Sequence, residues 1–520
     1  MKMTNKFING LEEELNYTVT ENGAVAYKSS LSGVLDAFGT LGSVRNWPEA
    51  DIIKVYNLAY HEDKELATKL LFWLRDVRGG AGERKTFRIL LTYCAEHYPK
   101  MVLANLDNIP YYGRWDDLLC LLDVDNTKYY VSSWLYRKLT DDVMAYSEDR
   151  YNDITLLAKW LPSINTSSAE TRRYANFLIK DWEMSPKQYR KTLSVLRKTI
   201  DVTEVKMSAN RWEDIKYQNV PSKAAMNYAE AFNRHDKIGY DKYLNDLAEG
   251  KAKINAGALF PADIVSRALI EKVNSLNDRV LTAQWKALPN YFEGKEEFGL
   301  AVVDVSGSMY GKPIEVAISL GMYLADKAVG PYSGKFITFS ARPELQSVVG
   351  NTITEKVKNL SNAYWDMNTN IEAVFRLILD VAVKNKLKQD EIPTKLYIIS
   401  DMQFDEATSK RVNYPIIPID KETLVETMQH EYEKYGYSLP ALVYWNVRSS
   451  DCGMFQQKVG DSNWCMVSGY SSSLFKSVMD GTEYVEEINE KGETVVKQRI
   501  DPIAVMLNTL NSERYSKVVV

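Results

Sequence analysis

The stretch over residues 298–312, FGLAVVDVSGSMYGK, constrains the fold of this 520-residue chain more than any other. Its apolar first part is typical of a buried strand, and that strand ends on Asp304. Ser306 and Ser308 follow at two-residue steps, and an amphipathic helix pattern begins after Gly311. Such a strand would deliver one carboxylate and two hydroxyls to a turn at the mouth of a helix, where open α/β sheets commonly bind ligands. The stretch therefore predicts an α/β domain that carries a divalent-cation site.

The sequence after residue 296 alternates between strand and helix patterns. The expected strands cover residues 298–303, 335–339, 395–400, 441–446 and 465–468. The expected helices cover residues 312–328, 370–384, 423–435, 472–480 and 502–510. This alternation indicates a doubly wound, mostly parallel sheet with helices on both faces. The charged segment 480–499 is expected to form a surface hairpin or loop around Lys491 and Gly492.

The first half of the chain has a different pattern, because apolar residues recur three and four apart from residue 28 to about 290. We expect an all-α array there, for which stacked helix pairs are one arrangement, although no fixed repeat period is visible. Pro289 and Gly294 mark a hinge over residues 283–295. The predicted fold class is α plus α/β, with a flexible polar arm (1–25), an all-α helical-repeat domain (26–290) and a doubly wound, Rossmann-like domain (296–520).

Two further elements support a metal site at the edge of the expected sheet. The segment WDMNTN places Thr369 directly before a helix, and KLYIISDM is a second apolar strand, which ends on Asp401. Both strand ends should lie at one sheet edge, so these oxygens should converge with those of Asp304. Oxygen-only ligands with two carboxylates favour Mg²⁺, or another divalent cation such as Mn²⁺, over softer metals. The alternative is structural: the two serines cap a helix and Asp401 is a hydrogen-bonded strand end.

The order DVSGSM, loop threonine and ISDM resembles the metal-ion-dependent adhesion site (MIDAS) of von Willebrand factor type A domains. The resemblance implies that the metal ligands are Asp304, Ser306, Ser308, Thr369 and Asp401. The threonine loop reads DMNTN rather than the glycine-containing approach of that family, which is a departure from the pattern. A site of this kind leaves one coordination position open, and an acidic group of a partner, either a carboxylate or a phosphate, would fill it.

Five stretches stand out in the helical half. They are LRDVRGGAGERK (74–85), YGRWDDL (112–118), KWLPS (159–163), MSPKQYRKTLSVLRK (184–198) and LFPADIV (259–265). Together with the expected A domain, these stretches resemble the TROVE-like proteins of uncharacterised function, which are relatives of the Ro autoantigen. In that group a ring of helical repeats precedes the A domain, and the Ro relatives bind single-stranded ends and structured small RNAs. The resemblance therefore implies an RNA-binding scaffold in a ribonucleoprotein.

The helical half also offers a local basic patch for RNA. The candidate RNA contacts are Arg75, Arg78, Arg84, Lys85, Arg88 and Arg114. The glycines between residues 79 and 82 would let backbone N–H groups approach a phosphate, and aromatic residues beside Arg114 suit stacked bases. A structural role is also open, in which Arg75 pairs with Asp76 and Arg84 with Glu83 as ion pairs that join helices. The net charge of −5 argues against a large RNA footprint.

Three functions are open for the predicted metal site. In the first, the protein is an RNA-binding scaffold and the metal accepts a phosphate. In the second, it is a protein-interaction or assembly module, and the metal grips an acidic side chain of a protein partner. In the third, which we favour least, Asp304 and Asp401 hold a metal that activates water for phosphodiester cleavage. The sequence has no GxSxG elbow or P-loop, so we do not expect an enzyme.

The remaining features of the sequence indicate a cellular setting. The four cysteines form no CxxC motif, which favours reduced thiols over a disulfide framework. The first residues lack the apolar core of a signal peptide, and no run of about 18 apolar residues occurs. We therefore expect a cytoplasmic protein without a membrane partner.

Overall fold

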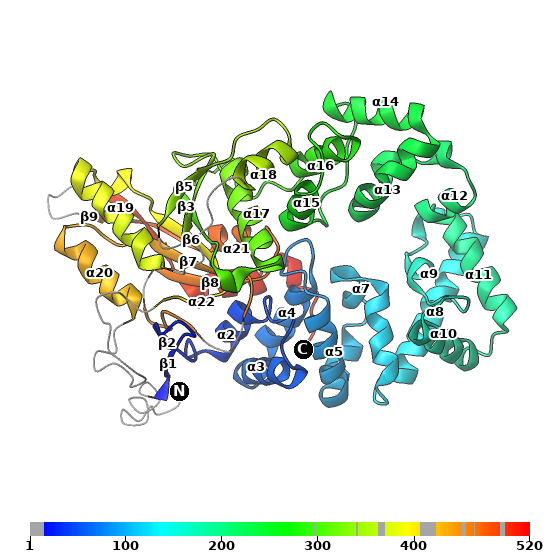
Figure 1. The fold of residues 1–520 in the computed structure, drawn as a ribbon. Helices are drawn as coiled ribbons and strands as arrows, with labels where there is room; N and C mark the ends of the chain where they lie inside the picture. The colour runs from blue at the N-terminus through cyan, green and yellow to red at the C-terminus, as the bar shows by residue number, and fades with distance from the viewer. Residues whose placement is uncertain are drawn as a thin grey trace.

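A computed structural model shows a helix-rich first half and a second half built on a mixed sheet (Figure 1). It describes residues 15–295, 297–339, 342–361, 370–405, 423–449, 454–461, 463–488 and 494–520. Buried apolar residues of both halves belong to one continuous core, and a smaller second cluster lies among the helices between residues 215 and 280. The two halves therefore share a hydrophobic core instead of meeting only through surface contacts.

Within the part of the chain that the structure describes, the sheet of the second half has six strands, in the order β5-β4-β3-β6-β7-β8. The strands are β3 (Gly299–Asp304), β4 (Lys335–Phe339), β5 (Glu344–Ser347), β6 (Lys395–Ser400), β7 (Ala441–Asn446) and β8 (Trp464–Ser468). All neighbours pair in parallel except β4 and β5, so the predicted mostly parallel sheet is confirmed, whereas the antiparallel edge strand β5 was not predicted. The strands β3, β6 and β7 are buried along their whole length, as parallel strands covered on both faces must be.

The strand order reverses around β3. From β3 the chain passes to β4 on one side, and it later returns to β6 on the other side. Val302 is accordingly paired with Ile337 in β4 and with Ile398 in β6. In open α/β sheets such a reversal leaves a crevice outside the carboxyl ends of the two strands, which is where ligands bind.

Among the described residues of the second half, six helices accompany the sheet. They are α17 (Lys312–Lys327), α18 (Ile353–Ser361), α19 (Ile371–Asn385), α20 (Leu424–Lys434), α21 (Leu474–Asp480) and α22 (Pro502–Leu510). Figure 1 shows α19 and α20 on one side of the sheet and α17 and α21 on the other, as the sequence predicts. The turn into α17 depends on Gly311, whose φ of 87° lies in the left-handed region that favours glycine.

The helical half runs from residue 33 to residue 286. Its helices are α2 (Gly33–Thr40), α3 (Glu49–Glu62), α4 (Lys64–Arg75), α5 (Lys85–His97), α6 (Pro99–Ala104), α7 (Asn108–Tyr112), α8 (Lys128–Ser147), α9 (Leu157–Trp160), α10 (Ala169–Asp181), α11 (Pro186–Thr199), α12 (Thr203–Ser208), α13 (Ser222–His235), α14 (Lys237–Ala248), α15 (Pro261–Ala268) and α16 (Leu276–Lys286), with a 3₁₀ helix η1 (Trp115–Asp123) after α7. Local sequence accounts for the starts of several of them. In α11, for example, Ser185 and Gln188 form a capping box, in which each side chain accepts the backbone N–H of the other.

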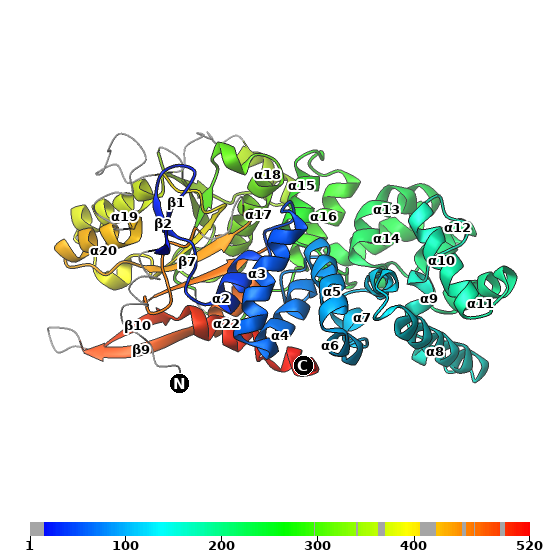
Figure 2. The ribbon, with the colours of Figure 1, turned by 90° about the horizontal axis from the view of Figure 1, so that it is seen from below.

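The helices follow a curved path that leaves the sheet and returns to it (Figures 1 and 2). The helix α2 packs against β8 at the start of this path, and α15 and α16 pack against α17 and α18 at its end. The helices α8 to α12 lie at the end of the molecule away from the sheet in both views. At the return point, the ring of Phe260 lies so close to Gly82 that a β-carbon there would overlap it. The first and last parts of the helical half are thus in contact.

The predicted flexible arm is wrong for the part of it that the structure describes. Residues 17–27 form an antiparallel hairpin of β1 (Tyr17–Val19) and β2 (Val25–Tyr27). The Thr20 hydroxyl donates a hydrogen bond of 2.6 Å to the carbonyl oxygen of Phe404, and Tyr27 pairs with Phe455 through two backbone hydrogen bonds. These partners come from the second half of the chain, more than 380 residues away, so local polarity could not reveal them.

The charged segment that was predicted to form a surface hairpin or a loop is a hairpin. Its strands β9 (Thr482–Ile488) and β10 (Thr494–Ile500) pair antiparallel. Among the described helices, none combines the length and the apolar character that crossing a membrane requires.

We expect Gly42→Ala to destabilise the protein, because this glycine lies at the contact between α2 and the end of β8. A methyl group at residue 42 would overlap the carbonyl of Ser468. Forcing extra volume into such a contact costs about 1–3 kcal/mol of unfolding free energy. Denaturant unfolding would measure this loss, with Gly257→Ala as the control, since a β-carbon there meets no atom within 4 Å. Equal stability of the two variants would contradict a tight contact between α2 and the sheet.

Candidate functional site

The structure places Asp304 and Asp401 at the same edge of the sheet. Their strands β3 and β6 are parallel neighbours, and Val303 is aligned with Ile399. Asp304 ends β3 and is fully buried, whereas Asp401 follows β6 directly and is 3% exposed. Both carboxylates therefore lie at the switch point of the strand order, where a ligand site is expected.

The serines of the predicted site surround these two carboxylates. The Ser306 N–H donates to Asp304 Oδ1 at 2.9 Å, and the Ser306 and Ser308 hydroxyl oxygens are 3.1 Å apart. The Ser308 hydroxyl also lies near the Asp401 carboxylate and lowers its pKa. Four of the five predicted metal ligands thus come together, and the fifth, Thr369, lies outside the described residues.

The two carboxylates are in an unfavourable electrostatic environment. Burial, followed by the negative charge of Asp401, raises the pKa of Asp304 to about 7. Burial likewise raises the pKa of Asp401, although the Ser308 hydroxyl and the Gln403 N–H offset part of the rise. Two neighbouring buried carboxylates whose pKa values are both raised favour sharing a proton or binding a cation.

Several polar groups around the carboxylates were not predicted. The Ser400 hydroxyl donates to Asp304 Oδ2 at 2.5 Å, and the Gln403 N–H donates to Asp401 Oδ1 at 3.2 Å. Arg448 donates a hydrogen bond to the carbonyl oxygen of Ser308, and its charge lowers the pKa of Asp401. Arg448 lies just after β7, the strand next to β6, so its position at the end of an apolar run was the available sequence signal.

The set of possible metal ligands at this edge differs from that of a site built on several acidic or sulfur ligands. Within the described ranges, no three His, Cys, Asp or Glu side chains are placed to hold a metal ion together. The predicted set instead combines two carboxylates with hydroxyls, which is a donor set for a hard cation that retains water ligands. The side chain of Tyr310, which is 85% exposed, follows the two serines in this loop.

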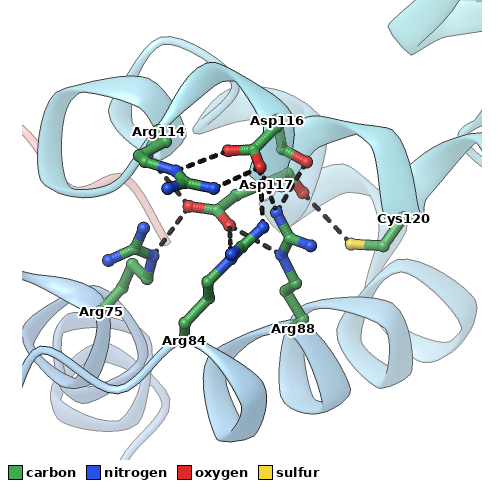
Figure 3. A network of polar contacts seen from close by, with 7 residues as sticks. All are labelled: Arg75, Arg84, Arg88, Arg114, Asp116, Asp117 and Cys120. Carbon is green, nitrogen blue, oxygen red and sulfur yellow. Dashed lines mark hydrogen bonds and ion pairs between the residues drawn. The ribbon is translucent and has the colours of Figure 1, made fainter. Parts of the chain in front are cut away.

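The candidate RNA-binding arginines lie in a different place, between α4, α5 and η1 (Figure 3). Asp117 is fully buried and accepts hydrogen bonds of 2.7 Å from both Arg75 Nε and Arg88 Nε. Arg84 and Arg114 both form ion pairs with Asp116, at 2.7 Å and 2.5 Å. Four of the six candidates are therefore held by two aspartates.

The structural alternative for this cluster is correct in kind, but its pairings are wrong. Asp76 pairs with Arg514 and Glu83 pairs with Arg45, so neither joins the arginine predicted for it. The two side chains of each predicted pair belong to adjacent residues, and they point to different neighbours instead of to each other. The last two candidates are exposed: Arg78 makes no side-chain ion pair with the described residues, and Lys85 Nζ donates to the Arg45 carbonyl oxygen at 3.1 Å.

A second region of the helical half joins aromatic and basic side chains. A cavity of about 690 Å³ is lined by residues of the KWLPS stretch and of α11 and α12, among them Lys159, Trp160 and Arg197. The guanidinium of Arg114 lies over the ring of Trp160, 4.1 Å from its centroid. The motifs YGRWDDL and KWLPS are thus adjacent in space.

The comparisons with known proteins agree with the division of the chain into two halves. A domain of unknown function, DUF2828, matches residues 20–128 and 180–294, and a second domain of unknown function, DUF7788, matches residues 299–510. The "Uncharacterized protein L728" of Acanthamoeba polyphaga mimivirus is 33% identical over 510 residues, which cover 90% of this chain and 86% of that protein. The chain belongs to the family of that viral protein. The two family models meet between residues 294 and 299, at the end of the predicted hinge.

We expect Asp117→Ala to destabilise the helical half strongly. The change leaves Arg75, which is 5% exposed, as a buried charge without its carboxylate. Breaking a buried pair in this way costs about 3–5 kcal/mol. Thermal and denaturant unfolding would measure the loss, and Asp125→Ala is a matched control because that aspartate is exposed. A loss of less than 1 kcal/mol, roughly that of an exposed ion pair, would show that the cluster is not structural.

Proposed function

We propose that the protein is a binding module that grips an acidic ligand through a divalent cation held at Asp304 and Asp401. The observation that carries the proposal is the pair of buried carboxylates at the ends of neighbouring strands, where burial raises the pKa of both and the charge of Asp401 raises that of Asp304 further. A bound cation would remove this repulsion. The arrangement supports the resemblance to the von Willebrand A metal-ion-dependent adhesion site.

The groups present fit Mg²⁺ or Mn²⁺. The proposed ligands are oxygen atoms of Asp304, Ser306, Ser308 and Asp401, with Thr369 as the further ligand that the resemblance implies. When bound, the ion would supply a localised positive charge that accepts an anionic oxygen of the partner. The residues of this chain would orient that charge through hydrogen bonds, because the Ser400 hydroxyl and the Gln403 N–H already fix one oxygen of each carboxylate.

The surroundings of the site favour an acidic side chain of a protein as the ligand. Arg448 is exposed and lies beside the Ser308 carbonyl, so its guanidinium could form a charge-assisted hydrogen bond with the same carboxylate. Tyr310 offers an exposed aromatic surface in the same loop. These contacts suit a protein–protein interaction, in which a buried metal–carboxylate contact is surrounded by aromatic and arginine side chains.

We expect Mg²⁺ to bind the purified protein and to raise its melting temperature, because the cation binds only the folded site. Asp401→Asn should abolish this shift, whereas Asp390→Asn should retain it, since Asp390 is an exposed aspartate of the same half. Calorimetric titration with MgCl₂ and MnCl₂ after chelator treatment would measure the affinity directly.

A partner captured by the wild-type protein in Mg²⁺ but lost in EDTA and in Asp401→Asn would support the binding role. Cleavage of RNA that depends on Mn²⁺ and on Asp401 would support the nuclease alternative instead.

A second candidate function is RNA binding by the helical half, as the resemblance to the TROVE-like proteins implies. The observation that favours it is the cavity at Lys159, Trp160 and Arg197, which combines cationic and aromatic side chains. Single-stranded RNA is bound by such combinations, because bases stack on aromatic rings and phosphates contact the cations. In this proposal Arg114 supports the Trp160 ring instead of contacting RNA directly.

We expect Lys159→Glu to weaken binding of a single-stranded RNA at low salt, because it reverses a charge at this cavity. The affinity of the wild-type protein should fall as salt rises, since phosphate contacts release counterions. Filter binding or fluorescence anisotropy with a labelled oligouridine would measure both effects, with Lys242→Glu on α14 as the control. If the wild-type protein leaves this RNA unbound at low salt, the second candidate is excluded.

A further inference from the structure

A second cavity, lined mainly by polar residues, lies where the two halves of the chain meet. It has a volume of about 700 Å³, which is within the usual range of small-molecule sites. The turn after α4 and the end of α7 contribute Arg78 and Tyr111 from the helical half. The helix α21 and the residues after α22 contribute Lys476 and Lys517 from the other half. Figure 2 shows α22 and the C-terminus beside α4.

A buried carboxylate fixes the inner wall of this junction cavity. Asp76 is fully buried and accepts hydrogen bonds from the guanidinium of Arg514 and, at 3.1 Å, from the hydroxyl of Tyr515. The same carboxylate accepts the backbone N–H of Arg78 at 3.0 Å. Asp76 thus holds the turn of the helical half and the C-terminal segment in one arrangement. The cavity is built by tertiary structure and is not a gap between mobile loops.

The glycines of the RGGAG motif allow this close approach. A β-carbon at Gly79 would lie 2.5 Å from Arg514 Nε, and one at Gly80 would overlap the carbonyl of Trp73. The motif therefore has a clear role at the junction: it brings the turn that carries Arg78 onto the C-terminal segment. The arginine of the motif remains exposed at the cavity.

The cavity has more cationic than anionic groups available for a ligand. Arg78 and Lys476 are exposed, and neither side chain forms an ion pair with the residues that the structure describes. Lys517 Nζ lies 4.7 Å from the centre of the Tyr111 ring. Two carboxylates also line the cavity: Asp480, which pairs with Lys295 at 3.5 Å, and Glu513.

The Tyr111 ring provides a planar surface beside these charges. Its side chain is 47% exposed, and its ring is held edge-on against Tyr112 at 4.9 Å between centroids. The Tyr112 hydroxyl in turn donates to the Arg514 carbonyl oxygen at 2.6 Å, so the aromatic pair is fixed to the same wall. An aromatic ring held in place next to exposed cationic side chains is a suitable surface for a base that carries a phosphate.

We propose that the junction cavity binds a nucleoside phosphate, with the phosphate between Arg78 and Lys476 and the base on Tyr111. Two sources share this chemistry: a free nucleotide and the 5′-phosphorylated end of an RNA strand. The site is separate from the carboxylates at Asp304 and Asp401, so the proposal does not depend on a bound metal. Because both halves contribute cations, a ligand here would also strengthen the contact between them.

Calorimetric titrations of the full chain in EDTA and low salt would test the proposal with two probes, AMP and a 5′-phosphorylated ten-nucleotide RNA. Lys476→Glu and Arg78→Glu should each weaken binding by about tenfold or more, since each reverses a charge that contacts the phosphate. Lys54→Glu on α3 should bind as the wild-type protein does, because that exposed lysine lies outside the cavity. Failure of both probes to bind, or unchanged binding in Lys476→Glu, would overturn the proposal.

The two sources give different results in the same experiment. Binding of AMP would assign the site to free nucleotides. Binding of the phosphorylated RNA alone, with loss of affinity for the same RNA ending in a 5′-hydroxyl, would assign it to a strand end. Tyr111→Ala separates the base from the phosphate: we expect about tenfold weaker binding of the nucleotide but unchanged binding of inorganic pyrophosphate. Equal weakening of both ligands would contradict the placement of the base.

Discussion

The parallel pairing of β3 with β6 is the constraint on which the candidate metal site depends. The register from Gly299 opposite Lys395 to Val303 opposite Ile399 brings both strands to the same edge of the sheet. The acidic residues that follow are then forced into proximity, with their carboxylates out of solvent. The sheet alone could not stabilise that pair as two anions, because burial removes both charges from water and the two charges repel each other. A cation, or a proton at lower pH, relieves the repulsion.

A second set of charges is compensated inside the protein. The aspartates at 116 and 117 hold four arginines where α4, α5 and η1 meet. Buried pairs gain little net free energy over apolar packing, but each becomes costly when one partner is lost. The arginine-rich appearance of this part of the sequence is therefore mainly a structural feature, and the basic groups left for a ligand lie elsewhere: at Arg78 and Lys85, and around Trp160.

The last residues of the chain connect the two halves. Val519 and Asn105 exchange hydrogen bonds, and Asn108 donates to the Lys517 carbonyl oxygen at 2.8 Å. Asp76 is bound to Arg514 from the same segment. This segment belongs to the second half by sequence but packs among helices of the first half. The junction cavity is lined by residues of both halves, so neither half would form it by itself.

The sequence by itself determined the central strands of the sheet and their end points. The strands β4, β6 and β7 occupy the predicted residues, because apolar runs bounded by polar residues are a local signal. The placement of two acidic residues after parallel strands also followed from the sequence, since the topology of such sheets is restricted. Only the tertiary structure decided which charges pair. Asp76 meets Arg514 across 438 residues instead of its neighbour Arg75, and the hairpin of residues 17–27 packs on a segment near residue 404. These contacts depend on which distant surfaces fold together, and periodicity along the chain carries no information about that choice.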